Sequence, residues 1–342
     1  MKARLVPVEE AVGMVIPHDI TEIRPGEFKG PAFKKGHIIQ ESDIEHLRRL
    51  GKEHIYALEL EEGEMHEDEA ALRLARAVAG PGVSYSQEIT EGKVSFWAAR
   101  TGLFKVETES LYQLNLLGEI MLATRHTDFW VKKGEPVAAG RAIPLVVKTD
   151  LLCQVEEITQ GKGIISVREP VIHRAGLVIT GNEVYYGRVE DAFVPALRPK
   201  LASLGLEVLP PRFVPDDPEL IRRGLEESFE AGADLVLVTG GMSVDPDDVT
   251  RQAVAQLGVE EFVYGSPVLP GAMFLIAYFK GRPILGVPAC GMYFRTTVLD
   301  LVLPRVICGE RLGRKDIARL GHGGFCLNCE RCRFPVCPFG RG

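Results

Sequence analysis

The stretch DLVLVTGG (residues 234–241) contains a short apolar run, LVLV, and ends in two glycines. An uninterrupted apolar run of this length is typical of a strand buried on both faces of a parallel sheet. The two glycines let backbone N–H groups approach an anion closely, and a helix that starts after them would add the attraction of its dipole. We therefore predict a strand over 234–238 and a ligand-binding loop that begins at Thr239.

The same rhythm of strand, loop and helix extends to both sides of this stretch. Asp217 is a good helix cap, and Pro218 fits the first position of the helix that follows. Strands that alternate with helices of this length predict a three-layer α/β domain over residues 171–312, with helices on both faces of a parallel sheet. The predicted elements are strands at 177–180, 206–209 and 234–238, and helices at 194–204 (kinked at Pro199) and 218–231.

The composition is that of an ordinary globular protein of two or three domains, with 342 residues, 46% hydrophobic and 25% charged. A formal net charge of −7 argues against a nucleic-acid binder, because phosphate binding needs a basic surface. The N-terminus, MKARLVPVE, lacks the apolar core of a signal peptide, and no uncharged apolar stretch is long enough to cross a bilayer. We expect a soluble, cytoplasmic protein with no nucleic-acid or membrane partner.

Two smaller parts precede the α/β domain. The segment GPG at 80–82 is a strong breaker and marks the boundary between them. Residues 1–80 are predicted to form a mixed α+β segment, and residues 81–170 a small, mostly-β module that serves packing or dimerisation. The predicted elements are a helix at 43–50, a strand at 54–60 and a helix at 67–79 in the first part, and a helix at 110–117 in the second.

Three loops have the position at which parallel sheets bind ligands, beyond the carboxyl ends of the strands. They are Thr180–Glu183, residues 239–248 and residues 287–291. The second loop contains too many acids for a bare phosphate site, unless a divalent cation bridges them. Capping of a helix before Val249 is an equal alternative for each acid. The chain has neither a GxGxxG motif nor a P-loop, which excludes the standard dinucleotide and P-loop sites. The acids concerned are Asp245, Asp247 and Asp248.

Taken in order, these segments resemble a known family. TGNEV at 180–184 is similar to the TGDE motif of the molybdopterin-binding domain, and VPDDPE at 214–219 is similar to its DDPE segment. TGGMSVDPDD at 239–248 resembles its TGGVSVGxxD loop, which is the most specific of the three motifs. Order and spacing agree over about 140 residues. The chain thus resembles the molybdopterin molybdenumtransferases of the gephyrin E-domain type and their smaller molybdopterin-binding relatives.

The resemblance implies a site that binds molybdopterin and inserts molybdate with the help of Mg²⁺. In that family the glycine-rich loop holds the pterin phosphate, and acids coordinate Mg²⁺ and molybdate; carboxylates can assist an oxyanion only through a cation or as proton donors. The catalytic residues implied are Glu183, Asp217 (with its neighbour Asp216) and Asp248. The cofactor-binding residues implied are Thr180, Gly181, Asn182, Thr239, Gly240, Gly241, Ser243, Asp245, Pro288 and Gly291.

The chain also departs from the family pattern. Asn182 replaces the family's Asp, and Asp245 replaces its second loop glycine. PACG at 288–291 replaces the PGNP turn, and VLPGA at 268–272 replaces KPGKP and so loses two lysines that would pair with phosphate or molybdate. The N-terminal half lacks the SAMDGYA stretch, and only residues 35–58 resemble the family's first segment. These replacements are expected to impair the insertion of molybdate more than the binding of the pterin.

Four of the seven cysteines crowd into the tail, residues 313–342. In a chain without an export signal, such a cluster predicts metal binding rather than disulfides. Four thiolates with this spacing suit an iron–sulfur cluster, which we prefer, or a tetrahedral Zn²⁺, while a redox thiol pair is a third option. Its basic flank suits partner docking or the charge of a tetrathiolate site. The predicted ligands are Cys326, Cys329, Cys332 and Cys337.

The three remaining cysteines, Cys153, Cys290 and Cys308, are expected to be small packed residues. Cys290 has an alternative, because it lies in the third loop and could there be a thiol ligand or handle sulfur.

Three functional hypotheses follow. The first is a molybdopterin molybdenumtransferase-like enzyme that uses molybdate and Mg²⁺. The second is a non-catalytic carrier or sensor of the finished cofactor, which delivers it to a client molybdoenzyme through the cysteine tail. The third is an electron-transfer accessory protein whose α/β domain is only a scaffold. A homodimer is compatible with each of them.

Overall fold

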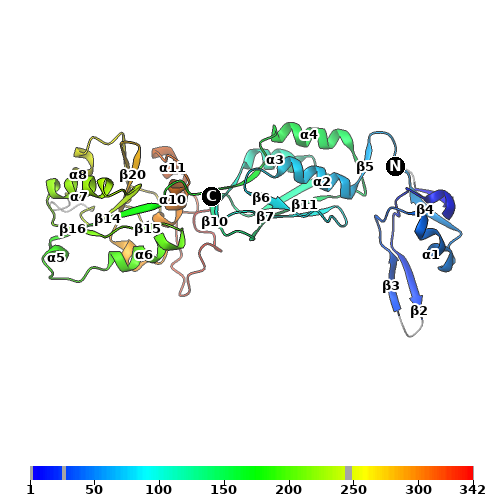
Figure 1. The fold of residues 1–342 in the computed structure, drawn as a ribbon, viewed down its shortest axis with the longest axis horizontal. Coiled ribbons are helices and arrows are strands. Elements are labelled where there is room, and N and C mark those ends of the chain that lie inside the picture. The colour runs from blue at the N-terminus through cyan, green and yellow to red at the C-terminus, as the bar shows by residue number, and fades with distance from the viewer. Residues whose placement is uncertain (1–2, 25–27, 243–248, 342) are drawn as a thin grey trace. The chain divides into compact units, whose positions relative to one another are not determined.

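The computed structural model describes residues 3–24, 28–242 and 249–341, which divide into two compact units (Figure 1). The first unit comprises Met1–Thr127 and Val131–Val167, and the second comprises Asp128–Trp130 and Arg168–Gly342. The finer boundaries at 80/81, 170/171 and 312/313 stay predictions. Within the described ranges, no helix has both the length and the apolar character needed to span a membrane.

The second unit is built around a mixed sheet whose central strands are parallel. In order across the sheet, the strands are β15 (Glu207–Val208), β14 (Arg174–Thr180), β17 (Leu235–Thr239), β20 (Arg282–Val287), β19 (Leu275–Phe279) and β18 (Glu261–Tyr264), and β16 (Arg212–Val214) also pairs with β14. β14 runs parallel to β15, β16 and β17, and β17 runs parallel to β20. β19 and β18 are antiparallel additions beyond β20.

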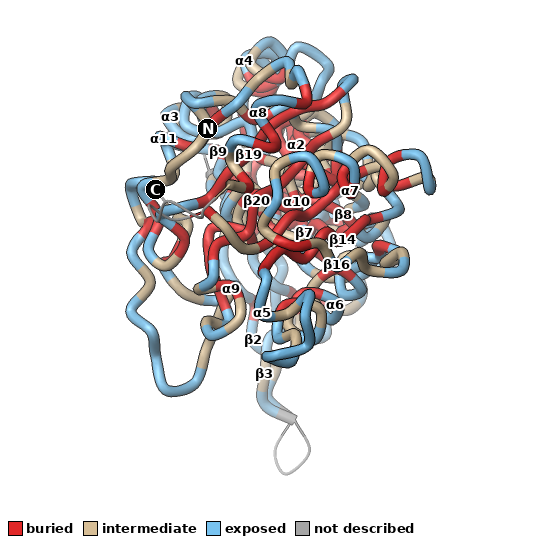
Figure 2. Tube along the Cα trace, turned by 90° about the vertical axis from the view of Figure 1, so that its left-hand side faces the viewer, coloured by how far each residue is buried: buried red, intermediate tan, exposed pale blue. Residues whose placement is uncertain are grey.

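Helices cover both faces of this sheet. They are α5 (Asn182–Tyr185), α6 (Phe193–Ser203), α7 (Pro218–Glu230), α8 (Thr250–Gln256), α9 (Cys290–Tyr293), α10 (Val298–Ile307) and α11 (Arg314–Arg319). α7 and α8 pack on one face, where Leu225 and Val254 join a buried cluster with Val178 and Val238 of the strands. Figures 1 and 2 show α6 on the opposite side. The predicted α/β fold, with helices on both faces of a parallel sheet, is therefore confirmed.

The burial of the central strands explains their sequence. Every residue of β17 is buried. So is every residue of β14 after Arg174, and β14 is red over most of its length in Figure 2. A strand that buries both faces has no solvent side on which to alternate polar residues, which is why residues 177–179 and 235–238 are all apolar. α6 contains Pro199 within its length, so this proline does not end the helix. β18 and β19 had no predicted counterpart.

The first unit combines small sheets with amphipathic helices. Its sheets are β1–β4, β2–β3, β5–β12, β6–β7–β11–β9 and β10–β8–β13. The strands are β1 (Ala3–Pro7), β2 (Ile20–Arg24), β3 (Phe28–Phe33), β4 (His54–Leu58), β5 (Glu64–His66), β6 (Val83–Tyr85), β7 (Lys93–Ala98), β8 (Gly102–Val106), β9 (Ile120–Thr124), β10 (Phe129–Val131), β11 (Pro136–Ala142), β12 (Val146–Lys148) and β13 (Ile165–Arg168). The helices are α1 (Ile44–Arg49), α2 (Glu67–Val78), α3 (Thr108–Leu116) and α4 (Thr149–Thr159), with 3-10 turns at Val8–Ala11 and Glu41–Asp43.

The helices predicted near 43–50, 67–79 and 110–117 and the strand predicted at 54–60 are all present. α4 was not predicted, because residues 83–167 were expected to contain a single helix. Its buried positions, Leu152, Val155 and Thr159, form only a narrow stripe. A narrow apolar stripe that ends in a threonine gives only a weak helical periodicity in the sequence.

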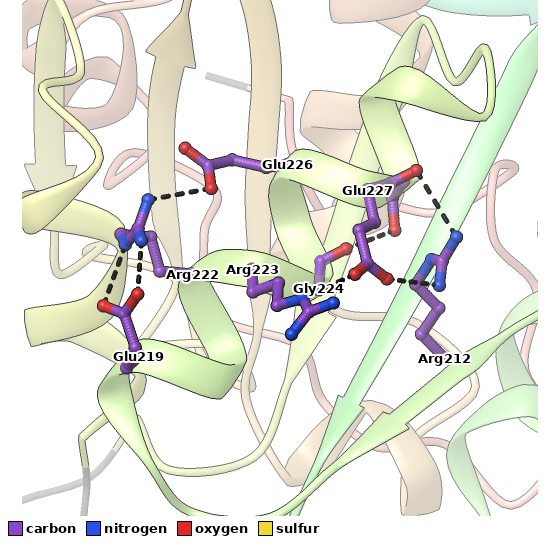
Figure 3. A network of polar contacts seen from close by, with 8 residues as sticks. Arg212, Glu219, Arg222, Arg223, Gly224, Glu226 and Glu227 are labelled. Carbon is purple, nitrogen blue, oxygen red and sulfur yellow. Dashed lines mark hydrogen bonds and ion pairs between the residues drawn. The ribbon is translucent and has the colours of Figure 1, made fainter.

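The outer face of α7 carries a network of ion pairs (Figure 3). Arg222 lies between Glu219 and Glu226, at i−3 and i+4 of the same helix. Glu227 accepts hydrogen bonds from Arg223 of α7 and from Arg212 of β16, each at 2.8 Å. The pairs within the helix contribute little because they are solvent-screened. The bond to Arg212 has a different consequence, since it fastens α7 to the strand that precedes it.

Candidate functional site

Four strand ends meet at one edge of the sheet in the second unit. Ile179 is aligned with Thr239, Thr239 with Val287, and Thr180 with Val214. The loops that follow β14, β16, β17 and β20 therefore start side by side, as expected for parallel neighbours. The structure brings together the three predicted loops, and it adds the Pro215–Asp217 turn to the same edge.

The glycine pair after β17 has a backbone that only glycine adopts without strain. Gly240 has φ +81° and Gly241 has φ +51°. A Cβ at Gly240 would lie 2.5 Å from both the carbonyl oxygen and Oγ1 of Thr180, and one at Gly241 would lie 2.6 Å from Oγ1 of Thr250. Both glycines are half-buried. The loop thus places bare backbone next to β14 and α8, in a position that a ligand can reach.

Hydroxyl groups fasten the base of this loop. Thr180 Oγ1 donates to the carbonyl oxygen of Thr239 at 2.7 Å, and it lies 3.2 Å from Thr250 Oγ1. Because the proton of Thr180 is already used, the hydroxyl of Thr250 is the donor in the second bond. Thr239 itself is fully buried, and its Oγ1 has no hydrogen-bond partner among the described residues. An unsatisfied buried hydroxyl costs free energy, so this group is available to a polar partner.

The loops after β14 and β16 are joined by a reciprocal pair of hydrogen bonds. The backbone N–H of Asn182 donates to Oδ2 of Asp216 at 2.8 Å, and the N–H of Asp216 donates to Oδ1 of Asn182 at 3.3 Å. Asp217, the next residue, caps α7 by accepting from the N–H groups of Glu219 and Leu220, each at 2.9 Å. The cap uses Oδ1 of Asp217, and the catalytic role of this residue stays a prediction.

Glu183 lies on the exposed side of the same edge. Its carboxylate turns back over Gly181, where a Cβ would lie 2.7 Å from its Oε1. Gly181 has φ +139°, again a conformation that favours glycine. The carbonyl oxygen of Glu183 accepts from the N–H groups of Arg188 and Val189, which closes the turn after α5. The carboxylate therefore faces the edge from a short and well-defined turn.

The third loop continues from β20 into α9. Pro288 is buried, and its carbonyl oxygen accepts from the N–H of Gly291 at 2.8 Å. A Cβ at Gly291 would lie 2.7 Å from a methyl group of Val287, so this position also needs glycine. Burial raises the pKa of the Cys290 thiol. A thiol with a raised pKa stays protonated at neutral pH, which supports the expected role as a packed residue.

Three predicted site residues, Ser243, Asp245 and Asp248, lie outside the described residues. The other predicted residues of the edge are Thr180, Gly181, Asn182, Glu183, Asp217, Thr239, Gly240, Gly241, Pro288 and Gly291, and all of them lie on the four loops described above.

Sequence reasoning missed two residues that support this edge. Thr250 fixes the glycine loop, but a threonine after an acidic run gives no signal of such a role. Lys200 of α6 donates to both carboxylate oxygens of Asp300, at 2.6 and 2.7 Å, and to the carbonyl oxygen of Arg295 at 2.7 Å. It thereby ties α6 to the start of α10, which follows the third loop. A lone lysine within a helix gave no hint of this contact.

The predicted metal ligands lie in a second region, at the C-terminal loop. Cys326, Cys329, Cys332 and Cys337 all line one cavity of about 220 Å³. None of them forms a disulfide. Within the described ranges, no group of three or more His, Cys, Asp or Glu side chains is arranged to hold a metal ion. The four thiols thus share a cavity, but no three of them are already arranged around one metal position.

The structure also shows where this loop is attached. Leu269 and Phe325 form a parallel β-bridge, in which Leu269 N–H donates to Gly324 and Cys326 N–H donates to Leu269, both at 2.8 Å. Gly340 N–H donates to the carbonyl oxygen of Gly323 at 2.9 Å and so closes the loop at its base. The tail therefore docks on residues 268–272, the segment that lacks the two lysines.

The arrangement at the sheet edge can bind an anion and hold a cation near it. Bare glycine backbone and threonine hydroxyls suit a phosphate or another oxyanion. Carboxylates on two neighbouring loops, Glu183 and Asp217, suit Mg²⁺ or proton transfer.

Comparisons with known proteins agree with this site at a coarse level. Residues 176–307 match a family described as "Probable molybdopterin binding domain", and residues 5–59 match a "Domain of unknown function (DUF8806)". The first match supports a domain related to the molybdopterin-binding family at the residues that form the sheet, as the motifs predicted. Neither match includes the cysteine loop.

Curated relatives cover only part of the chain. A CinA-like protein of Mycobacterium avium is 37% identical over 99 residues, which is 29% of this chain and 23% of that protein. A CinA-like protein of Mycobacterium tuberculosis is 39% identical over 90 residues, 26% of this chain and 21% of that protein. The chain thus spans less than a quarter of the length of these relatives.

Three solved structures were compared. CinA from Thermoplasma acidophilum, of unknown function, has a TM-score of 0.36 and 18% identity, and covers 40% of this chain and 99% of its own. The molybdopterin biosynthesis enzyme MoaB from Thermus thermophilus has a TM-score of 0.36 and 25% identity, and covers 41% and 98%. A molybdopterin biosynthesis MoeA protein from Pyrococcus horikoshii has a TM-score of 0.33 and 16% identity, and covers 71% and 79%. At TM-scores below 0.5 we infer nothing further from them.

Proposed function

We propose that the second unit binds molybdopterin at the carboxyl edge of its sheet and inserts molybdate into it, or into its adenylated form, with Mg²⁺. The observation that carries this proposal is the glycine pair after β17, where bare backbone stands between Thr180 and Thr250. The amides of Gly240 and Gly241, with the hydroxyls of Thr239 and Ser243, would hold the pterin phosphate. Asn182 and Asp245 would lie beside it.

The acids of the edge have two roles in this proposal. Insertion requires molybdate, an oxyanion, to meet a phosphorylated dithiolene, so negative charge accumulates at the reacting centre. Glu183, Asp217 and Asp248 would hold Mg²⁺, which offsets that charge, or would supply protons to the departing oxygens of molybdate. A transferase of this kind would act in the cytoplasm on small molecules. Homodimer formation is compatible with the proposal.

The alternative function is that of a carrier or sensor that binds finished cofactor without turnover. It is favoured by the loss of the two lysines at 268–272 and by the replacement of the PGNP turn at 288–291. In this alternative the tail, with an iron–sulfur cluster or Zn²⁺ on its four cysteines, would meet a client molybdoenzyme.

One experiment separates the two functions. Pure full-length protein is mixed with molybdopterin, in free or adenylated form, molybdate and Mg²⁺, and the formation of molybdenum cofactor is measured. The insertase predicts turnover that depends on molybdate and Mg²⁺ and disappears in the Glu183→Gln/Asp248→Asn double variant. Tight binding of finished cofactor with no turnover indicates the carrier. Absence of any pterin binding contradicts both.

A further inference from the structure

The C-terminal loop, residues 325–338, does not have enough packing of its own to hold its shape. Among its described residues there is no helix and no strand beyond the single bridge at Phe325. Phe325, Leu327 and Val336 are 70%, 68% and 74% exposed, so its large apolar side chains do not form a core. A loop of this length without regular structure is uncommon in a compact domain unless it has a function. Another kind of interaction has to hold it together.

The ends of the loop, in contrast, are firmly attached. The bridge between Leu269 and Phe325 fixes the start, and the bond from Gly340 to Gly323 closes the base. Phe339 is 4% exposed, and a Cβ at Gly340 would lie 2.3 Å from a methyl group of Leu301 in α10. Between these anchors the contacts are few: the N–H of Val336 donates to the carbonyl oxygen of Arg333 at 2.7 Å, and the rings of Phe334 and Phe339 meet edge to face.

The four cysteines of the loop face one cavity, with Cys329 exposed and the other three partly buried. All four cysteines line the cavity of about 220 Å³, together with residues 293–296 of the segment that joins α9 to α10. Four thiolates within twelve residues of sequence can close around one metal centre. A thiolate-bound metal would thus supply the interior that the loop lacks.

The surroundings of the cavity suit a negatively charged thiolate centre. Arg295 and Arg333 both line it, with Glu330 as the acid among its lining residues. The hydroxyl of Thr296 lies 3.3 Å from Sγ of Cys332. A hydroxyl that donates to a ligand sulfur orients that ligand and stabilises its charge. Thr296 is 5% exposed and precedes Thr297, which caps α10, so its position is fixed by the domain.

We propose that residues 325–338 form a metal-closed loop in which Cys326, Cys329, Cys332 and Cys337 bind one metal centre as thiolates. The centre is an iron–sulfur cluster or a tetrahedral Zn²⁺, which share this donor chemistry. Each thiol releases its proton to solvent and donates a sulfur lone pair to the metal. Because no three of the thiols are already arranged around one metal position, binding draws the four ligands together and orders the loop. The carrier alternative assumes such a centre, but the cavity and its four thiols are independent of pterin binding.

The first test is the metal content of full-length protein purified without oxygen. Iron, zinc and acid-labile sulfide are measured per chain, before and after reconstitution with either ferrous iron and sulfide or Zn²⁺. We expect about one zinc, or iron and sulfide in similar amounts with visible absorption, per chain. Failure to retain either metal after both reconstitutions overturns the proposal, and so does a disulfide among these cysteines that forms in place of metal uptake.

Two variants make this test specific. Cys326→Ser/Cys329→Ser removes two proposed ligands, and we expect its metal content to fall at least about tenfold. Cys153→Ser is the matched control, because it removes an exposed thiol of the first unit and should leave metal content unchanged. Equal metal content in the double variant and the control overturns the proposal. Circular dichroism of the double variant establishes that the rest of the chain is folded.

Pterin binding is measured on the same variants, which keeps this proposal distinct from the proposed function. Loss of metal with retained pterin binding supports the metal-closed loop as a separate site. Absence of pterin binding in a protein that still takes up metal contradicts the proposed function and leaves the metal-closed loop supported.

Discussion

The glycine loop after β17 and the metal-closed loop at 325–338 are two candidate binding regions built in opposite ways. The glycine loop is fixed by strand alignment on both sides and by the hydroxyls of Thr180 and Thr250. The C-terminal loop is fixed mainly at its ends, with Thr296 near Cys332 between them, and it borders a cavity. A site that consists of backbone groups is complete once the fold is complete. A site that consists of metal-binding side chains needs its metal in order to form.

This difference leads to different expectations for mutation. Substitutions at the sheet edge should change stability and binding together, because the same backbone serves both. Substitutions in the C-terminal loop should change metal binding and local order, with little effect on the sheet. The four predictions below test this contrast, in order of decreasing effect.

The largest effect is expected for Gly240→Ala. The added Cβ would meet a backbone oxygen and a hydroxyl of Thr180 at 2.5 Å, in addition to the strain of a positive φ. We expect a loss of about 3 kcal/mol in the free energy of unfolding and about a hundredfold weaker pterin binding. Chemical denaturation and a binding titration measure these two quantities.

Gly258→Ala is the matched control for this change. Gly258 has a similar φ of +72°, but nothing lies within 4 Å of the position of its Cβ. Strain alone should cost about 1 kcal/mol, without effect on pterin binding. If Gly240→Ala were no more harmful than Gly258→Ala, the close packing at the glycine loop would have no role in the site.

The next effect concerns Asp217, which both caps α7 and is a proposed catalytic acid. Serine is also a good cap, so Asp217→Ser should keep the free energy of unfolding within about 0.5 kcal/mol. It should nevertheless lower molybdate insertion about a hundredfold, because the carboxylate is gone. Activity and denaturation are measured on the same preparation. Full activity in Asp217→Ser would limit Asp217 to its capping role.

Metal removal should have a smaller and strictly local effect. Arg331 and Arg333 are exposed trypsin sites within the metal-closed loop. A chelator should raise the rate of cleavage at these sites about tenfold, while cleavage elsewhere is unchanged. Peptide mapping over time gives both rates. The Cys326→Ser/Cys329→Ser variant should be cleaved quickly with or without chelator; protection of that variant would contradict metal-dependent closure.

The smallest effect is a difference in thiol reactivity after metal removal. Burial raises the pKa of Cys290, so at a given pH less of it is thiolate, and thiolate is the reactive form. We expect its alkylation to be severalfold slower than that of the exposed Cys153 at about pH 7, and to speed up as the pH rises toward its pKa. Mass spectrometry of the alkylated peptides measures both rates. Faster reaction at Cys290 would favour its alternative role as a thiol ligand.

Much of the second unit could be predicted from sequence because its signals are local. Residues 177–179 and 235–238 are apolar at every position, since both faces of those strands are buried. Asp217 followed by Pro218 marks the start of α7, and the structure confirms that cap. The loops at the sheet edge followed from these elements, because parallel strands place their carboxyl ends together.

The rest of the site depended on contacts between distant residues. The hydrogen bond between Thr180 and Thr250 joins residues 70 positions apart, and that between Lys200 and Asp300 joins residues 100 positions apart. No pattern in the sequence near these residues predicts either hydrogen bond. The β-bridge between Leu269 and Phe325 is of the same kind, and it shows that the segment without lysines is the one that receives the tail.

That bridge has an evolutionary consequence. The tail is attached through main-chain N–H and C=O groups of Gly324, Cys326 and Leu269, and such groups are the same in almost every residue type. Side chains between the anchors can therefore be exchanged without detaching the segment. During evolution the sulfur ligands could be lost, gained or replaced while the tail stays attached to the domain. Homologous chains would therefore be expected to differ most in what this loop binds.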